Sequence, residues 1–327
     1  MIIVKVPFRV SLLGGGTDFP AFYKKHGGCV IGGTIDKYCY ITIRKISEVF
    51  KYKYRIVWSK NEIENKISEI KNPIVNEVLK YFKVNDKIEI HFQADLPKNS
   101  GIGSSSSFCV GLIHAISKFK KLKLSQKRMA EVAMYIEQIK LKEYCGSQDQ
   151  IWASYGGFRI INFLSNNSFK VKNIEISEVK KNKLKNNLLL MFTGYQRYSK
   201  NVEKKKVTNL SKNVSHLIQI KNLTLKLRRV LESNVNLNKV GNLLNEYWHL
   251  KKKLAGGVSN VFIDRLYNRL LKNGATGAKL IGSGSGGFFL LYCDKKKQNK
   301  LKKQMKQFTF LDFNFSKEGS EIIYENK

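Results

Sequence analysis

The sequence predicts a protein that mixes β-strands with α-helices, and three neighbouring patterns support this prediction. In residues 88–93 apolar and polar side chains alternate, which is typical of a half-buried strand. Residues 108–119 repeat apolar side chains at helical spacing, which predicts a helix with a buried face. The stretch between them, residues 101–107, holds two glycines and four serines. A chain of 327 residues can build one large domain or two around such a unit.

The loop at residues 101–107 has the chemistry of a phosphate-binding loop. Glycine lets the backbone approach a ligand closely, and serine hydroxyls add donors at the start of the helix. The first N–H groups of a helix are unpaired and lie at the positive end of its dipole, so they attract an anion. A surface turn that only caps the helix is the alternative. The chain contains no Gly-x-x-x-x-Gly-Lys-Ser/Thr sequence, so this loop is not the common nucleotide-binding P-loop.

The other segments are interpreted from their apolar spacing and their capping residues. Strands are expected in residues 1–11, 30–43, 54–58, 159–163 and 188–194. Residues 30–43 are expected to form a pair of strands, interrupted by Asp36 and Lys37. Helices are expected in residues 73–82, 199–233, 235–254, 259–272 and 295–306, and in a segment that Ser125 caps and that carries Glu137.

Two lysine-rich stretches receive a structural rather than a functional interpretation. Residues 166–187 are polar and weakly periodic, and we expect a domain junction there. Lys251, Lys252 and Lys253 are expected to form a solvent-exposed face of a helix.

The composition excludes several classes of function. The formal net charge is +34, but the excess is mostly lysine and is spread along the whole chain. No recognition motif accompanies it, so we expect no specific nucleic-acid partner, and the charge suits an anionic substrate. The five cysteines are scattered without a Cys-x-x-Cys pair, which argues against a disulfide framework and a zinc site. Without a run of about 18 apolar residues or a signal peptide, a cytoplasmic protein that does not contact a membrane is expected.

Three stretches resemble, in order along the chain, the three motifs of the GHMP kinase superfamily, which includes galactokinase, homoserine kinase and mevalonate kinase. Residues 97–107 resemble its Pro-x-x-x-Gly-Leu-Gly-Ser-Ser-x motif, with Ile102 in place of leucine. Residues 277–287 resemble its Gly-Ala-Lys-x-x-Gly-x-Gly-Gly-Gly-Gly motif, with Ser285 in place of glycine. The first motif is matched at Pro7, Arg9, Val10, Leu12, Gly14, Thr17 and Asp18.

A fourth stretch resembles the galactokinases in particular. Residues 145–150 keep their Cys-Gly-x-x-Asp-Gln loop, and Glu137 precedes Asp149 by the same interval. Gly15 and Gly16, however, stand where galactokinases have the Glu-His pair that contacts their sugar. This difference argues against galactose as the substrate.

The resemblance implies an α+β protein with the two-domain GHMP kinase fold. A ribosomal-protein-like, ATP-binding domain would span residues 1–180, and a ferredoxin-like domain would span residues 181–327. The implied activity is a kinase that uses ATP and Mg2+, with Ser105 and Glu137 as the metal ligands. Asp149 would act on the acceptor hydroxyl as a base or through its charge, and Arg9 would face the transferred phosphoryl group. The residues implied to bind ATP are Pro97, Ser100, Gly101, Ile102, Gly103, Ser104, Ser105, Ser106 and Ser107.

Longer stretches resemble the branch that phosphorylates the anomeric hydroxyl of D-glycero-D-manno-heptose 7-phosphate, namely residues 7–11 with 14–18, 34–40, 95–97 with 100–107, 146–150 and 192–194. The 1,7-bisphosphate would supply nucleotide-activated heptose for a surface polysaccharide such as capsule or lipopolysaccharide. The residues implied to contact the sugar phosphate are Gly15, Gly16, Thr17, Asp18, Asp36, Lys37, Gln148, Gly194, Arg197, Gly284 and Ser285. Because the phosphate of the substrate needs cationic partners, Arg197 and Lys37 are candidates to hold it. The alternatives are a fucose- or galactose-type kinase, a mevalonate- or homoserine-type kinase and a non-catalytic basic binding protein, as a monomer or a homodimer.

Overall fold

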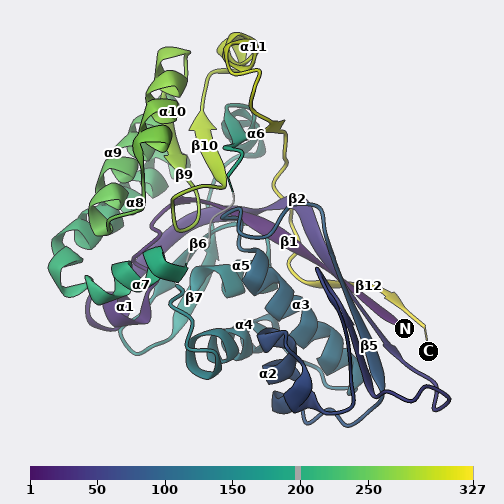
Figure 1. Ribbon diagram of the computed structural model, residues 1–327. Helices are drawn as coiled ribbons and strands as arrows, with labels where there is room; N and C mark the ends of the chain where they lie inside the picture. The colour runs from purple at the N-terminus through teal and green to yellow at the C-terminus, as the bar shows by residue number, and fades with distance from the viewer. Residues whose placement is uncertain (196–199, 327) are drawn as a thin grey trace.

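The computed structural model describes residues 1–195 and 200–326, except for the side chains of residues 200 and 201. Two β-sheets with helices packed against them form the molecule, which confirms the predicted α+β class (Figure 1). The first sheet has eight strands in the order β12-β1-β2-β5-β3-β4, with β6 paired to β2 and β7 paired to β6. The second sheet has four strands in the order β11-β8-β10-β9.

The strands of the first sheet come from both ends of the chain. They are β1 (Ile2–Leu13), β2 (Gly28–Lys45), β3 (Tyr54–Val57), β4 (Asn61–Glu64), β5 (Ile88–Ala94), β6 (Phe158–Phe163), β7 (Phe169–Asn173) and β12 (Glu321–Glu325). The strands of the second sheet are β8 (Leu188–Phe192), β9 (Gly277–Leu280), β10 (Phe288–Tyr292) and β11 (Phe310–Leu311). Because β12 pairs with β1, the end of the chain returns to the first sheet (Figure 1). The domain boundary near residue 180 stays a prediction.

The predicted pair of strands in residues 30–43 is wrong, because these residues belong to the single long strand β2. β1 pairs with β2 along nearly its whole length, while the other edge of β2 changes partner. Residues 28–33 pair with β6, and residues 39–45 pair with β5. Asp36 lies between these two ladders, where its backbone N–H donates to the carbonyl of Asn314 at 3.0 Å. The polar interruption therefore marks a change of partner strand and not a turn.

The helices of the first half pack on one face of the first sheet. They are α1 (Pro20–His26), the short η1 (Ile67–Glu69), α2 (Pro73–Tyr81), α3 (Ser104–Phe119), α4 (Gln126–Met134), the π-helix η2 (Tyr135–Lys140) and α5 (Gln148–Tyr155). α3 packs directly on β1 and β2. Gly111 permits this contact, since a Cβ there would lie 2.3 Å from Cδ1 of Ile41 on β2. The predicted cap of α4 is confirmed, because Oγ of Ser125 accepts a hydrogen bond from the N–H of Arg128 at 3.1 Å.

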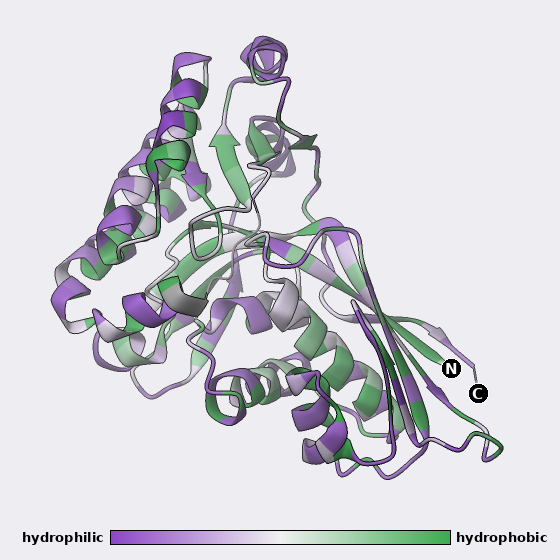
Figure 2. Cartoon of the chain, in the orientation of Figure 1, coloured by the Kyte–Doolittle hydropathy of each residue, from purple (hydrophilic) through white to green (hydrophobic). Residues whose placement is uncertain are grey.

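The helices of the second half pack on both sheets. They are α6 (Glu178–Asn186), α7 (Lys200–Thr208), the short η3 (Ser211–Asn213), α8 (Val214–Glu232), α9 (Asn238–Leu254), α10 (Val261–Lys272) and α11 (Lys295–Gln304). The single helix expected in residues 199–233 is therefore divided into α7 and α8, which lie on either side of η3. Figure 2 shows β10 as hydrophobic and α11 as largely hydrophilic, in agreement with a central strand and a surface helix. Among the described residues, no helix is long and apolar enough to span a membrane.

Candidate active site

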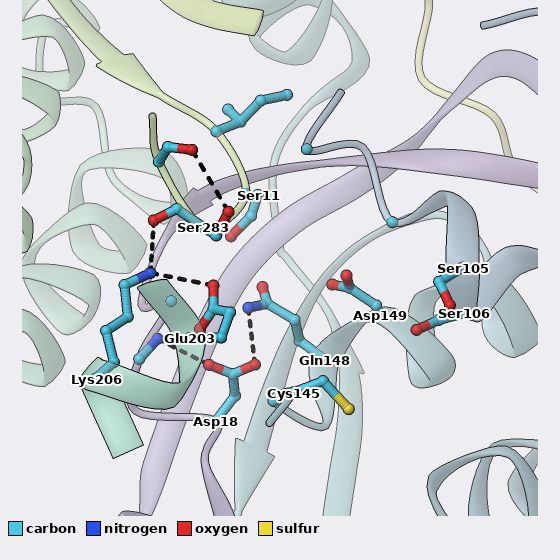
Figure 3. Close-up of a pocket in the computed structure, with 18 of the residues that line it drawn as sticks. Ser11, Asp18, Ser105, Ser106, Cys145, Gln148, Asp149, Glu203, Lys206 and Ser283 are labelled. Atoms are coloured by element: carbon cyan, nitrogen blue, oxygen red, sulfur yellow. Dashed lines mark hydrogen bonds and ion pairs between the residues drawn. The ribbon is translucent and has the colours of Figure 1, made fainter. Parts of the chain in front are cut away.

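A polar cavity lies beside the start of α3 and gathers residues from both halves of the chain (Figure 3). Its walls include Arg9 of β1, the loop before α3, and Glu137 of η2. Asp149 of α5 and residues of the glycine-rich segment 282–286 also line the cavity, so both halves of the chain contribute to its walls. All three motifs that the sequence analysis singled out thus contribute to one cavity.

The serine-rich loop reaches the cavity through two glycines in the left-handed region of backbone space. Gly101 has φ +83° and Gly103 has φ +79°, and a Cβ on Gly101 would lie 2.7 Å from the carbonyl oxygen of Ile281. Gly103 immediately precedes α3, so the first N–H groups of the helix lie beside the cavity wall. Gly101, Gly103, Ser104, Ser105 and Ser106 line the cavity.

Four further loop residues shape the loop without lining the cavity. The hydroxyl of Ser100 donates to the carbonyl of Pro97 at 2.6 Å, and the hydroxyl of Ser107 donates to the carbonyl of Pro7 at 3.1 Å. Ile102 is fully buried in the core, and its carbonyl accepts a hydrogen bond from the N–H of Arg9 at 3.1 Å. These contacts of Pro97, Ser100, Ile102 and Ser107 fix the shape of the loop.

Glu137 is buried at the start of α3, where it accepts three hydrogen bonds. The donors are the hydroxyls of Ser105 at 3.0 Å and Ser106 at 2.7 Å, and Nε2 of Gln150 at 2.6 Å. Burial raises the pKa of Glu137 to about 7, and these hydrogen bonds oppose the shift. The carboxylate and the Ser105 hydroxyl together offer hard oxygen atoms of the kind that Mg2+ prefers.

Arg9 and Asp149 form an ion pair on the wall between the loop and the rest of the cavity. Nε of Arg9 lies 2.7 Å from Oδ1 of Asp149, and Nη2 lies 2.6 Å from Oδ2. The same guanidinium donates to the carbonyl of Gly101. Asp149 follows Gln148 in the first turn of α5, which holds its carboxylate on a rigid element.

Asp18 and Gln148 form a second polar group on the side of Asp149 away from Ser105 and Ser106 (Figure 3). The carboxylate of Asp18 accepts hydrogen bonds from the N–H of Gly16 and from Nε2 of Gln148, both at 2.8 Å. Burial raises the pKa of Asp18 to about 6, and the nearby charge of Asp149 adds to this shift. Gly15, Gly16, Asp18 and Gln148 all line the cavity.

Comparison with known proteins shows the family of the chain. The family model "GHMP kinases N terminal domain" matches residues 68–157, and "GHMP kinases C terminal" matches residues 231–309. The chain is also 31% identical, over 97% of each sequence, to D-glycero-alpha-D-manno-heptose 7-phosphate kinase of Campylobacter jejuni. The chain belongs to the GHMP kinase family.

Two further relatives of this GHMP kinase agree with that membership. Over 90% of each sequence the chain is 24% identical to galactokinase of Pyrococcus furiosus. The crystal structure of a D-glycero-D-manno-heptose 1-phosphate kinase from Bacteroides thetaiotaomicron superposes with a TM-score of 0.81 over 100% of both chains. The sequence identity is 20%, so this likeness shows a shared fold alone. As a GHMP kinase, the protein is a phosphotransferase that acts on a hydroxyl group with ATP as the phosphate donor.

The structure does not bring all of the predicted substrate residues to the cavity of this kinase. Asp36 and Lys37 lie outside it, which corrects their expected role. The carboxylate of Asp36 accepts hydrogen bonds from the N–H and Nδ2 of Asn314, both at 2.8 Å, and Nζ of Lys37 lies 3.6 Å from Oδ1 of Asp36. Asp36 therefore holds the returning C-terminal segment against β2 through Asn314, and Lys37 pairs with Asp36.

Five other residues were predicted to contact the substrate. Thr17 is buried, and its hydroxyl donates to the carbonyls of Gly14 and Cys29 rather than facing the cavity. The hydroxyl of Ser285 donates to the carbonyl of Gly257, and neither Ser285 nor Gly194 lines the cavity. Gly284 does line it. Arg197 lies outside the described residues.

The sequence analysis missed three lysines that line the cavity, namely Lys206, Lys251 and Lys279. Lys251 was expected on a solvent-exposed face, but only 3% of it is exposed. The signal was present in the spacing of α9, where Leu244, Tyr247, Lys251 and Leu254 follow one another at helical intervals on the buried face. Of the three consecutive lysines, only Lys251 lies on the buried face of α9, so the run as a whole looked like an exposed face.

Proposed function

We propose that the protein transfers the γ-phosphoryl group of ATP to the anomeric hydroxyl of D-glycero-D-manno-heptose 7-phosphate, which gives the 1,7-bisphosphate. The observation that carries this proposal is the position of Asp149 between two polar groups. The serine-rich loop with Glu137 lies on one side of it, and Asp18 with Gln148 lies on the other (Figure 3). The full-length similarity to the heptose 7-phosphate kinase of Campylobacter jejuni supports the choice of sugar.

The loop before α3 suits the triphosphate of ATP. Its two left-handed glycines bring the backbone to the cavity surface, and the N-terminus of a 16-residue helix attracts an anion. We assign the triphosphate to Gly101, Gly103, Ser104 and Ser106. We assign Mg2+ to Ser105 and Glu137, since their oxygens lie 3.0 Å apart on the same wall and need little movement to share an ion. The ion would neutralise charge on the phosphate oxygens when it is bound.

Asp149 and Arg9 have complementary roles in the proposed reaction. Asp149 accepts a hydrogen bond from the acceptor hydroxyl and takes its proton, or stabilises the charge that develops there. The bidentate contact with Arg9 fixes the direction of the Asp149 carboxylate, so Arg9 positions this group toward the acceptor hydroxyl. The guanidinium also contacts the carbonyl of Gly101, so it connects the phosphate loop with the residue that acts on the sugar.

Asp18 and Gln148 would hold hydroxyl groups of the sugar ring. An ionised carboxylate is an acceptor-only group, which suits several hydroxyl donors. Oε1 of Gln148 is buried, and it has no hydrogen-bond partner within the described part of the chain, so a sugar hydroxyl would satisfy it. We place the enzyme in the cytoplasm, where its product would supply nucleotide-activated heptose for a surface polysaccharide.

The test is a substrate panel with purified protein, ATP and Mg2+. Heptose 7-phosphate is compared with the unphosphorylated heptose, galactose, fucose and mevalonate, and phosphorus NMR identifies the position of the new phosphate. We expect the highest kcat/KM with heptose 7-phosphate and a new signal at the anomeric carbon. Equal use of galactose or of unphosphorylated heptose would contradict the assignment of the sugar. Use of mevalonate alone would assign the protein to another branch of the family.

A further inference from the structure

Three lysine side chains from three different elements line the same cavity, namely Lys206 of α7, Lys251 of α9 and Lys279 of β9. They are 8%, 3% and 2% exposed, so all three ammonium groups are largely removed from solvent. Such burial is unusual for lysine without a counter-ion. The three positions come from the second half of the chain, which supplies none of the residues assigned above to ATP or to the acceptor hydroxyl.

Two of these lysines have only backbone carbonyls as hydrogen-bond acceptors among the described residues. Nζ of Lys251 donates to the carbonyls of Leu280 at 2.7 Å and Gly282 at 2.6 Å. Nζ of Lys279 donates to the carbonyls of Ser11 and Leu12, both at 2.9 Å. An ammonium group has three donors, so each keeps one N–H that these carbonyls do not use. Nζ of Lys279 also lies 4.3 Å from the ring centre of Tyr247, so the unused N–H of Lys251 is the freer of the two.

Lys206 differs because it has one carboxylate partner. Its Nζ lies 3.1 Å from Oε1 of Glu203 and donates to the carbonyl of Ser283 at 2.7 Å. That carbonyl directly follows Gly282, the acceptor for Lys251, so the two ammonium groups meet at the same turn of the chain. Burial lowers the pKa of Lys251 and of Lys279, and repulsion from the charges of Lys206 and Arg9 lowers both further. A bound anion would relieve both effects.

A second observation also points to a ligand at this end of the cavity. Oγ of Ser11 is buried and has no hydrogen-bond partner within the described part of the chain. Ser11 lines the cavity, and Figure 3 shows it beside Ser283, on the side away from Ser105 and Ser106. A hydroxyl in such a position can donate to an oxygen of a ligand, which would remove the cost of leaving it unpaired.

We propose that Lys206, Lys251 and Lys279 hold the phosphate group that the sugar substrate already carries. This inference rests on the proposed function, in which that phosphate lies far along the sugar from the anomeric hydroxyl at Asp149. Arg9 cannot serve this purpose, because its guanidinium is engaged by Asp149 and Gly101. Lys37, the cation expected from the sequence, lies outside the cavity.

The experiment replaces Lys206 by methionine, which keeps the length of the side chain and removes its charge. The matched control is Lys205→Met, since Lys205 is the exposed neighbour on the same helix. The quantity measured is the ratio of kcat/KM for heptose 7-phosphate to kcat/KM for the unphosphorylated heptose. Because both values come from the same preparation, the ratio does not depend on the fraction of protein that is folded.

We expect Lys206→Met to lower this ratio by roughly 10- to 100-fold, the range for one lost hydrogen bond between charged groups. Lys205→Met and the charge-conserving Lys206→Arg should keep it within about threefold of the wild type. The KM for ATP should not change in Lys206→Met. If that KM rises while the ratio holds, the lysines contact the phosphates of ATP and the inference is wrong. If Lys206→Met does not fold, Lys251→Met is measured in the same way.

The failure of this inference is distinguishable from the failure of the proposed function. A wild-type enzyme that shows no preference for the phosphorylated heptose would overturn both. A wild-type enzyme with a clear preference that Lys206→Met retains in full would overturn the phosphate site alone.

Discussion

The guanidinium of Arg9 donates two parallel hydrogen bonds to the carboxylate of Asp149, from Nε to Oδ1 at 2.7 Å and from Nη2 to Oδ2 at 2.6 Å. The two residues lie 140 positions apart in the sequence, one on β1 and the other in the first turn of α5. Bidentate contacts of this kind fix geometry as well as charge. The pair therefore sets the direction from which Asp149 meets a ligand in the cavity.

Replacing Asp149 by asparagine tests its proposed role in the transfer. The change keeps the shape of the side chain but removes the base and the charge that faces Arg9. We expect turnover to fall by at least about 100-fold, the lower end of general-base contributions, while the affinity for ATP stays within a few-fold. Steady-state kinetics and ATP titration provide the two values.

A suitable control for this change is Asp264→Asn. Asp264 lies on α10 and pairs with Lys252 at 3.0 Å, away from the cavity. The Asp264→Asn substitution should leave turnover unchanged. Near-normal turnover in folded Asp149→Asn would move the catalytic role to another residue.

Replacing Glu137 by glutamine, or Ser105 by alanine, tests the proposed metal ligands. Each change removes a hard oxygen or its negative charge, so more Mg2+ should be needed to reach half of the maximal rate. We expect the concentration to rise by about tenfold or more for Glu137→Gln, and by less for Ser105→Ala. The measurement is a Mg2+ titration of the rate at saturating ATP. Glu131→Gln on α4 is the control, and identical curves for all variants would make Glu137 and Ser105 structural.

Replacing Asp18 by asparagine should stabilise the protein in a pH-dependent way. Burial raises the pKa of Asp18 from 3.8 to about 6, so the folded protein binds this proton more tightly than the unfolded chain does. The free energy of unfolding of the wild type therefore falls as the pH rises from about 4 to about 6, and it stays lower above that range. Asparagine carries no such charge, and the amide of Gln148 can turn so that its unpaired Oε1 accepts the new N–H.

The gain in free energy of unfolding from Asp18→Asn should therefore be largest at neutral pH, up to about 3 kcal/mol, and small near pH 4. Urea unfolding of both proteins at about pH 4 and about pH 7.5 measures it. Glu137 titrates in both proteins, so its contribution cancels in the difference. If the difference in free energy of unfolding between the two proteins does not change with pH, ionisation of Asp18 does not destabilise the folded protein.

Replacing Gly101 by alanine tests the close contact between the serine-rich loop and the glycine-rich segment. Gly101 has φ +83°, and a Cβ there would lie 2.7 Å from the carbonyl oxygen of Ile281. We expect a loss of stability of about 1–3 kcal/mol and a higher KM for ATP, because the loop must move away from its partner. Gly256→Ala is the control, since a Cβ at Gly256 meets no atom within 4 Å. Equal melting temperatures for the two variants would show that the loop accommodates a side chain.

Local patterns were enough to predict the elements that the cavity depends on. The apolar spacing around residues 88–119 predicted β5, α3 and the loop between them, and the loop does line the cavity. Ser125 was recognised as a helix cap because capping depends on a few neighbouring residues. The three motifs predicted a GHMP kinase, and the family comparisons confirm it.

The sequence by itself therefore determined the fold class, the family and the serine-rich loop before α3, because each is encoded in residues close together along the chain. Only the tertiary structure decided which charges face the cavity. Asp36 was predicted from the sequence as a site residue, but it binds Asn314 of the returning C-terminal segment. Lys251 was predicted on the surface, but it is buried and donates to the carbonyls of Leu280 and Gly282. The physical reason is that the cost of burying a charge depends on partners that long-range folding supplies, and no local spacing records them.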